Sequence, residues 1–259
     1  MKTKPRIGII GYGALGQALE SHLEKIHDGA EIVGYINNSA SPALGDKKHA
    51  ATFDELLRRK PDVIVECAGQ QALARYGLAV VQAGVDLVPA SIGALADDEF
   101  RHGLLAASRL SGASVRMPSG AIGGIDALAA AHHVGINKVL YRGTMPPSTL
   151  RAHYKGTLPE WGLVFSGPAR EAISLFPKNV NLTGTIALAG VGFDSTQVEM
   201  IVDPSLTANV HELFVNGEFG EFHVEIRGYR ISDASPSSRI VAGSLAQAAL
   251  GSNFMLLRQ

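Results

Sequence analysis

The stretch Arg6-Ile7-Gly8-Ile9-Ile10-Gly11-Tyr12-Gly13-Ala14-Leu15-Gly16 joins a short apolar run directly to a glycine-rich turn. Apolar residues then recur with helical spacing at Ala18, Leu19, Leu23 and Ile26. A strand, a Gly-x-Gly-x-x-Gly turn and a helix in this order are typical of the first βαβ unit of a dinucleotide-binding fold. The stretch therefore predicts a Rossmann-type parallel sheet and a bound nucleotide cofactor, although such a turn also occurs for close packing alone.

Each glycine of this turn has a separate expected role. Gly11 allows the tight turn, Gly13 has no side chain to block the pyrophosphate, and Gly16 lets the helix lie close to the strand. Free N–H groups at the start of the helix, at Ala14 and Leu15, and the helix dipole favour the phosphates. We therefore expect all five residues to contact the cofactor.

Composition limits the classes of protein to which this chain can belong. With 259 residues, of which 46% are hydrophobic, the chain suits two modest domains better than one large core. The formal net charge is −1 and there is no run of five like charges, which argues against a nucleic-acid or anionic-membrane partner. The predicted partner is a small molecule.

Neither a secretory signal nor a membrane span is expected. The basic start, Met1 to Pro5, is followed by an apolar run that Gly-Tyr-Gly interrupts, without a cleavage-site pattern. No apolar segment approaches the ~20 residues that span a bilayer. Cys67 is the single cysteine, which excludes an intrachain disulfide and fits a cytoplasmic protein.

The first domain is predicted over residues 1–118, where short apolar strands alternate with helical segments. Thr52-Phe53-Asp54-Glu55 has capping-box spacing and opens a helix that runs through Arg59. A longer helix starts near Asp97. Beyond the first strand, further strands are expected at Glu31–Asn37, Asp62–Cys67, Leu87–Pro89 and Ser114–Met117.

Two segments at predicted strand ends are candidates for cofactor contacts. Cys67, Ala68 and Gly69 end a strand at the carboxyl edge, where ligands of open α/β sheets bind, but a plain turn explains them equally well. Asn37 and Asn38 stand where NAD-selective folds carry an Asp or Glu. Amides bind a ribose and tolerate a 2′-phosphate, so both NAD and NADP are allowed, unless these residues only form a turn. Lys47 and Lys48 follow in the same loop and can approach a phosphate.

The second domain is predicted over residues 119–237 as an α+β unit with a mixed or antiparallel sheet. A second glycine-rich turn, Ser119 to Asp126, feeds an Ala-rich helix. Asn216-Gly217 is a strong hairpin signal because both residues tolerate positive φ. The segment Ser238–Leu250 reads as an amphipathic helix, and residues 238–259 are expected to return to the first domain. The expected strands are Gln197–Val202, His211–Val215 and Glu221–Gly228.

Six motifs along the chain together resemble the L-aspartate dehydrogenase family. The similarity extends in order over nearly the whole chain, and six motifs in register are specific where any single one is weak. They are Gly-Tyr-Gly-Ala-Leu-Gly at 11–16, Glu-Cys-Ala-Gly at 66–69, Ser-Gly-Ala-Ile-Gly-Gly-Ile-Asp-Ala-Leu at 119–128, Phe-Pro-Lys-Asn-Val-Asn at 176–181, Ala-Leu-Ala-Gly at 187–190, and Asp-Pro with Asn-Val-His at 203–211.

This resemblance implies an NAD(P)-dependent oxidative deamination of aspartate, through iminosuccinate, to oxaloacetate and ammonia. It also implies a homodimer, with a catalytic histidine at His211 and further cofactor contacts at Ala121 and Asn181. A histidine that titrates near neutrality suits proton exchange with nitrogen or water. Without the resemblance, His211 is one of nine histidines, Ala121 a turn residue and Asn181 a helix N-cap. The cellular role is open between supplying iminosuccinate for NAD biosynthesis and degrading aspartate.

One departure from the family bears on the substrate. Where the family usually has Arg-Lys-Pro-Pro, this chain has Thr144-Met145 before the two prolines. Because aspartate has two carboxylates, the loss of a cation pair can weaken substrate binding or change its choice, unless those cations only lie on the surface. Arg142, Lys155 and Lys178 remain as candidate anchors.

Two other functions stay open at this stage. One is a related NAD(P)-dependent reductase or dehydrogenase that acts on another small carboxylate or imine, and the other is an inactive NAD(P)-binding regulator. A metal-dependent mechanism fits poorly, because no His, Cys or carboxylate cluster has ligand spacing. His132 and His133 are neighbours on a helix, so they point to different faces and read as helix surface.

Overall fold

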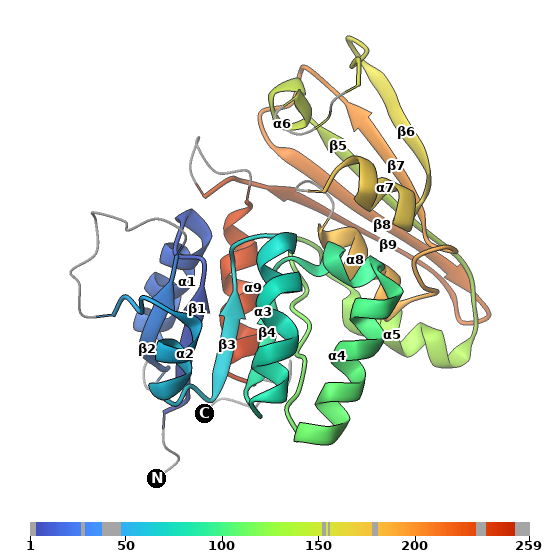
Figure 1. Ribbon diagram of the computed structural model, residues 1–259. Coiled ribbons are helices and arrows are strands. Elements are labelled where there is room, and N and C mark those ends of the chain that lie inside the picture. The colour runs from blue at the N-terminus through green and yellow to red at the C-terminus, as the bar shows by residue number, and fades with distance from the viewer. Residues whose placement is uncertain are drawn as a thin grey trace. The chain divides into compact units, whose positions relative to one another are not determined.

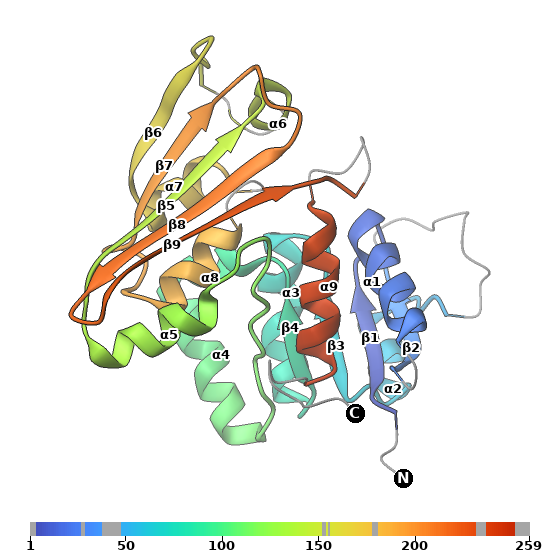
Figure 2. The ribbon, with the colours of Figure 1, turned by 180° about the vertical axis from the view of Figure 1, so that it is seen from behind.

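The computed structural model describes residues 4–26, 29–37, 48–151, 154, 156–177, 181–231 and 237–251. The chain forms two compact units (Figures 1 and 2). The first consists of Met1–Pro118 together with Val241–Gln259, and the second consists of Ser119–Ile240. The second unit is therefore an insertion within the sequence of the first.

The first unit is built on a four-stranded sheet in the order β2-β1-β3-β4, and all of its strand pairs are parallel. The buried strands consist almost entirely of β-branched and other apolar residues, as is typical of a parallel sheet covered on both faces. The strands are β1 (Arg6–Ile10), β2 (Glu31–Ile36), β3 (Val63–Glu66) and β4 (Asp86–Pro89).

Helices of the first unit begin where the sequence provides caps. Thr52 accepts a hydrogen bond from the Glu55 N–H at the start of α2, and Asp97 accepts one from the Phe100 N–H at the start of α4. The helices are α1 (Ala14–Lys25), α2 (Phe53–Arg58), α3 (Gln70–Gln82), the 3-10 helix η1 (Ile92–Ala96), α4 (Asp98–Ser111) and α9 (Arg239–Ala249).

Helix α9 completes the core of the first unit. Leu245, Ala246 and Ala249 are buried in one cluster with Ile7, Leu19 and other residues of the N-terminal half. In Figures 1 and 2, α9 lies beside α1 and the sheet. The predicted fold class, including the return of a C-terminal helix, is therefore confirmed.

One predicted strand is wrong. Within Ser114–Met117 only Val115 forms a bridge, to Leu87, and no strand is built on it. Two backbone hydrogen bonds join this segment to β4, from Leu87 N to Ser114 O and from Arg116 N to Leu87 O, and the Ser114 N–H also donates to the Asp86 carboxylate at 2.7 Å. The Arg116 side chain bonds Asp86 and two carbonyls of α9 instead of continuing a ladder.

The second unit has a mixed five-stranded sheet in the order β6-β7-β5-β8-β9. Strands β5 and β7 are parallel, whereas the other neighbours are antiparallel. Burial alternates along β5, β7 and β8, so one face of the sheet is buried and the other is more exposed. The strands are β5 (Ile136–Met145), β6 (Gly162–Pro168), β7 (Gln197–Val202), β8 (Asn209–Gly217) and β9 (Gly220–Gly228).

Helices of the second unit pack against this sheet and one another. Helix α5 contacts β8, α7 contacts β6 and β7, and α8 contacts both of these helices. A Cβ built on Gly124, at the start of α5, would lie 2.9 Å from a Val224 methyl carbon of β9, so α5 begins in close contact with the sheet. The helices are α5 (Ile125–Val134), α6 (Pro147–Arg151), α7 (Ala169–Leu175) and α8 (Asn181–Ala189).

The hairpin between β8 and β9 is present, but its turn lies two residues later than predicted. Asn216 and Gly217 remain in the ladder, opposite Glu221 and Gly220, and residues 218–219 form the turn. A Cβ on Gly217 would meet the Gly135 carbonyl oxygen at 2.1 Å. Gly217 is therefore needed for the close approach of the chain before β5 rather than for the turn.

Candidate active site

The glycine-rich turn in the first unit has the predicted backbone geometry. Gly11 has φ +90°, and a Cβ there would lie 2.6 Å from the Cβ of Ala68. A Cβ on Gly16 would lie 2.4 Å from the Gly11 carbonyl oxygen, so α1 approaches the turn too closely for any side chain. The expected tight turn and the expected helix packing are both confirmed, and Gly11 and Ala68 are brought together.

Gly13 differs from the other two glycines, because a Cβ built on it would meet nothing within 4 Å. It is the N-cap of α1 and supplies no side-chain hydrogen bond to the first turn, in which Ala14 and Leu15 are the first residues. The start of α1 thus has uncapped N–H groups and open space beside them, which suits a phosphate group. The residues present therefore fit the pyrophosphate of a dinucleotide.

Glu66 braces the segment Cys67-Ala68-Gly69 at the carboxyl edge of the sheet. Its side chain is 1% exposed, and Oε1 accepts hydrogen bonds from the N–H groups of Ala68 (2.6 Å) and Gly69 (2.7 Å). Ser91, after β4, donates to Glu66 through its N–H at 3.1 Å and its hydroxyl at 3.0 Å. One buried carboxylate therefore fixes the ends of two neighbouring strands.

The two titratable groups at this edge have shifted pKa values. Burial raises the pKa of Glu66, although the donors from Gly69, Ala68 and Ser91 act in the opposite direction. All four bonds are donated to Glu66, so its arrangement suits the carboxylate form. Burial also raises the pKa of the Cys67 thiol well above its ordinary value, with the Glu66 charge as a second cause. Cys67 is thus held as an unreactive thiol.

The predicted ribose contacts are described only in part. Asn37 directly follows β2, and the Gly11 N–H donates to the carbonyl of the preceding residue, Ile36, at 2.9 Å. The backbone of Asn37 therefore lies beside the glycine turn. Asn38 and Lys47 lie outside the described residues. Lys48 was a candidate for contact with a phosphate. Its ammonium pairs with Glu20 of α1 at 2.7 Å, so its charge is already partly neutralised.

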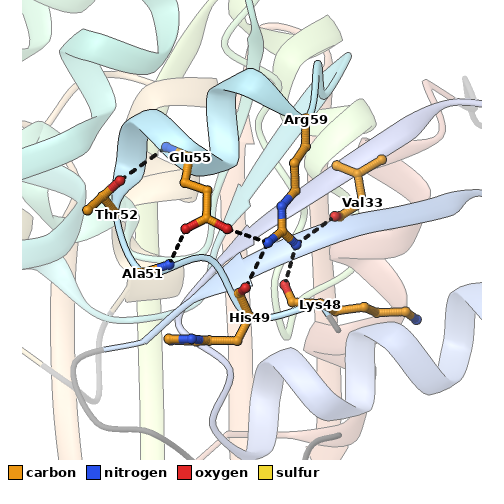
Figure 3. Close-up of polar contacts among 7 residues, drawn as sticks. All are labelled: Val33, Lys48, His49, Ala51, Thr52, Glu55 and Arg59. Atoms are coloured by element: carbon orange, nitrogen blue, oxygen red, sulfur yellow. Dashed lines mark hydrogen bonds and ion pairs between the residues drawn. The ribbon is translucent and has the colours of Figure 1, made fainter. Parts of the chain in front are cut away.

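Arg59 fixes the chain that returns from the loop after β2. Its guanidinium donates to the carbonyls of Val33 (3.2 Å), Lys48 (2.9 Å) and His49 (2.7 Å) and pairs with Glu55 at 2.7 Å (Figure 3). The bonds therefore tie the edge of the sheet at β2 to the residues before α2.

In the second unit, His211 lies on the buried face of the mixed sheet rather than at a strand edge or on the surface. It belongs to β8, the fourth of five strands, and is 5% exposed. Its Nδ1 is 2.8 Å from the hydroxyl of Tyr141, a fully buried residue of β5. The two rings are 6.1 Å apart with an angle of 18° between their planes. Both members of the pair are therefore buried.

Gly143 makes this contact possible. It is the cross-strand partner of His211, whereas Tyr141 is opposite Leu213, two residue pairs further along. A Cβ on Gly143 would lie 2.7 Å from the Tyr141 hydroxyl, which shows that the phenol leans over Gly143 to reach the imidazole. Any larger residue at this position would displace the phenol.

The burial of this pair overturns one expectation. Loss of water contact lowers the pKa of His211 to about 4, so the imidazole is neutral at physiological pH instead of titrating near neutrality. Burial also raises the pKa of Tyr141, which therefore stays protonated. Because a phenol both donates and accepts, either neutral tautomer of His211 keeps the bond, with a lone pair or a proton at Nε2.

The two other predicted cofactor residues belong to the second unit. Ala121 lies in a turn before α5 and is 6% exposed. Asn181 is the first residue of α8 and is partly buried. The described contacts connect neither of them with His211.

The positions of the absent cation pair lie on the two faces of β5. Met145 is 1% exposed and lies on the same face as Tyr141, whereas Thr144 points to the other face and is partly exposed. The candidate anchor Arg142 shares the face of Thr144, pairs with Glu199 at 2.8 Å and lies over the Phe214 ring, so its charge is engaged on the face away from His211. Lys155 and Lys178 lie outside the described residues.

Sequence reasoning missed Tyr141. The alternation of buried residues over Val139, Tyr141, Gly143 and Met145 is a period-2 signal, but the strand that carries it was not predicted. Asn209 was seen only as part of the Asn-Val-His motif, although its spacing from His211 places both on one face.

Across the described residues, no group of three or more His, Cys, Asp and Glu side chains is arranged to hold a metal ion. His132 and His133 are exposed near the end of α5, with ring centroids 5.7 Å apart. No helix in the described part of the chain has the length and apolar character needed to cross a membrane.

Comparison with known families gives two matches, which are separated near the unit boundary at residue 118. Residues 126–252 match the family model "Aspartate dehydrogenase, C-terminal". Residues 11–118 match the model "Homoserine dehydrogenase, NAD binding domain". The two matches leave out residues 1–10, 119–125 and 253–259, and the second of these models does not include α9, which belongs to the C-terminal match.

Individual relatives match over the full length. L-aspartate dehydrogenase 1 of Bordetella pertussis (strain Tohama I) is 59% identical over 257 residues, which cover 99% of this chain and 100% of that protein. L-aspartate dehydrogenase of Serratia proteamaculans is 37% identical and covers 94% of this chain and 95% of its own length. The crystal structure of aspartate dehydrogenase from Thermotoga maritima has a TM-score of 0.79 and 26% identity, covering 98% of this chain and 99% of that one.

Proposed function

The chain belongs to the L-aspartate dehydrogenase family, and from this premise we propose that it catalyses the reversible NAD(P)-dependent oxidative deamination of L-aspartate to oxaloacetate and ammonia. In the forward direction a hydride leaves the α-carbon and the amine loses a proton, which gives iminosuccinate. Water then adds to the imine carbon and ammonia leaves. The reverse direction is the reductive amination of oxaloacetate.

The observation that carries this proposal is the buried His211–Tyr141 pair on the sheet of the second unit. A neutral histidine with a protonated hydrogen-bond partner is suited to exchange protons with an amine or an attacking water. His211 is the family's catalytic position by resemblance, and its burial supplies the neutral form that a base requires.

The cofactor supplies the hydride acceptor and donor, and the glycine turn of the first unit is the proposed place of its pyrophosphate. We assign the contacts to Gly11, Gly13, Ala14, Leu15 and Gly16, with Cys67, Ala68 and Gly69 at the neighbouring strand end. Ala121 and Asn181 are proposed contacts from the second unit.

We further propose that NAD and NADP are both used. Asn37 and Asn38 present amides where a carboxylate would repel a 2′-phosphate. The Lys48 ammonium is paired with Glu20, so no strong preference for the phosphate is expected from that residue. The ratio of the two affinities is therefore expected to lie within about tenfold, a difference of about 1.4 kcal/mol.

A direct test follows the absorbance of NADH and NADPH in parallel when the purified protein meets oxaloacetate with ammonium. Pyruvate and 2-oxoglutarate, each with ammonium, are the controls. Oxidation confined to oxaloacetate with ammonium would support the proposal and rank the cofactors. Bound cofactor without oxidation, or faster oxidation with a control acid, would overturn the assignment of substrate.

The family resemblance also supports a homodimer that acts on small molecules in the cytoplasm. Light scattering of the purified protein measures its mass against the 27.3 kDa of one chain. A mass near twice this value is expected, and a mass equal to one chain would contradict the dimer.

A further inference from the structure

A second polar residue of β8 lies on the same face of the sheet as His211. Asn209 precedes His211 by two residues and is 6% exposed. Thr149 of α6, which is 4% exposed, donates from its hydroxyl to the Asn209 amide oxygen at 3.3 Å. This bond leaves the amide nitrogen of Asn209 as a donor.

Arg230 joins the same group of residues from the chain that follows β9. Its Nη2 donates to the Thr149 hydroxyl oxygen and lies 3.5 Å from the Ser148 hydroxyl. Its Nε is buried and has no acceptor among the described residues. No carboxylate within the described ranges pairs with this guanidinium, in contrast to Arg227 on β9, which pairs with Glu225 at 2.8 Å.

A buried N–H of a charged group without an acceptor is costly, and a ligand, an ion or a water that accepts from it removes this cost. The group that best satisfies a guanidinium is a carboxylate, which accepts two parallel hydrogen bonds from its planar fork. Thr149 holds the fork in place because its hydroxyl accepts from Arg230 while it donates to Asn209. The geometry therefore presents one fixed cation and one amide donor on the His211 side of the sheet.

We propose that Arg230 binds a carboxylate of the substrate, with Asn209 as the second donor and Thr149 as the residue that orients both. The proposal rests on the proposed function, since it names the anchor for a dicarboxylate substrate. It also supplies a positive charge where the family's usual Arg-Lys-Pro-Pro would offer a cation pair and this chain has Thr144-Met145. The required charge comes from a distant part of the sequence.

The spacing along β8 suits this assignment. Residues two apart on one face of a strand are separated by about 7 Å. A carboxylate held beside Asn209 therefore leaves the next carbons of a four-carbon acid directed along the strand towards His211. Binding and proton exchange are then adjacent functions of one strand.

The decisive experiment measures binding of succinate, an unreactive four-carbon dicarboxylate, to the NADH-loaded protein by calorimetry. Arg230→Gln is expected to weaken succinate binding about 30-fold or more, as expected when a buried charged hydrogen-bond partner is removed. Arg227→Gln removes the same charge from the neighbouring exposed pair and is the matched control, with an expected change of less than about twofold. Thr149→Val is expected to have an intermediate effect because the fork loses its support.

Kinetics provide an independent measurement. Arg230→Gln is expected to raise KM for oxaloacetate by a similar factor with a smaller change in kcat, which is the pattern for lost ground-state binding. If Arg230→Gln does not fold, Arg230→Lys retains the charge without the fork and is expected to weaken succinate binding about tenfold.

Three outcomes would overturn the proposal: no succinate binding by the wild-type protein, unchanged succinate binding by Arg230→Gln, or an equal loss in Arg227→Gln. A wild-type protein that does not turn over oxaloacetate, but binds succinate in an Arg230-dependent way, would refute the proposed function and support this carboxylate site. The two failures are therefore distinguishable.

Discussion

The candidate sites of the two units differ in whether backbone or side-chain groups form them. In the first unit, backbone geometry forms the site: a glycine at φ +90°, an open helix N-terminus and strand ends fixed by Glu66 through three backbone N–H groups. In the second unit, side chains form the site, with His211 bonded to Tyr141 and Thr149 bonded to Asn209.

This difference explains what a substitution can do in each place. A backbone site is damaged mainly by adding atoms, because its residues leave space for a ligand or for one another. A side-chain site is damaged mainly by removing atoms, because each group supplies a proton, a charge or a hydrogen bond. Substitutions in both directions therefore test the contrast.

The largest effect is expected from His211→Ala in the side-chain site. Loss of the proton-exchanging group should lower kcat for reductive amination by about 10²- to 10⁴-fold. Affinity for NADH, measured by fluorescence titration, should remain within about twofold, because the glycine turn belongs to the other unit. Turnover that persists in the variant would show that the proton role is wrongly assigned.

Acid should weaken the second unit through the same histidine. The folded pKa of about 4 lies below the ordinary value near 6.5, so the stabilisation is present above pH 6.5 and is lost as the pH falls towards 4. Over this range the effect amounts to about 3 kcal/mol. Urea unfolding of the wild type and His211→Asn at several pH values measures it.

Carboxylates titrate in this range too, so the difference between the two proteins is the relevant quantity. The free energy of unfolding of the wild type should fall more steeply than that of His211→Asn. Parallel slopes would mean that the histidine is not buried in its neutral form.

Two glycines of the backbone site separate folding from binding. Gly13→Ala adds a methyl group to open space, so the melting temperature should be unchanged while affinity for NADH falls about tenfold or more, or about 1.4 kcal/mol. Gly16→Ala adds a methyl group 2.4 Å from the Gly11 oxygen and should cost about 1 to 3 kcal/mol of stability. Calorimetric melting and NADH titration of each variant provide the measurements. Equal melting temperatures of both variants would contradict this distinction.

The smallest effect is expected from Arg142→Gln. This variant breaks the half-exposed pair with Glu199 on the face of the sheet opposite His211. Its stability should change by less than about 1 kcal/mol. KM for oxaloacetate should be the same as in the wild type, and a large increase would instead identify Arg142 as a substrate anchor.

The same contrast decides how much the sequence reveals. The glycine turn is local, and the spacing of the three glycines within its six residues indicates the backbone geometry. The Rossmann-type unit and its turn could therefore be predicted. The capped helix at Thr52 and the helix at Asp97 were equally readable, because caps act within four residues.

The side-chain site could not be assembled in this way. Tyr141, Thr149, Asn209 and Arg230 converge only through strand pairing and packing, which no local spacing encodes. The resemblance supplied His211 but not its burial, and therefore not the direction of its pKa shift. The turn predicted at Asn216-Gly217 was misplaced for a similar reason. Gly217 is required because the backbone of Gly135, which is distant in sequence, approaches it closely.

The position of α9 has a consequence for synthesis of the chain on the ribosome. Most residues of the nucleotide-binding unit emerge before those of the second unit, yet Leu245, Ala246 and Ala249 belong to its core and emerge after them. Domains generally fold as units during translation. The second unit, whose residues are contiguous, can therefore complete its fold while the first still has an uncovered apolar surface. The unit whose synthesis starts before the other therefore completes its core after it.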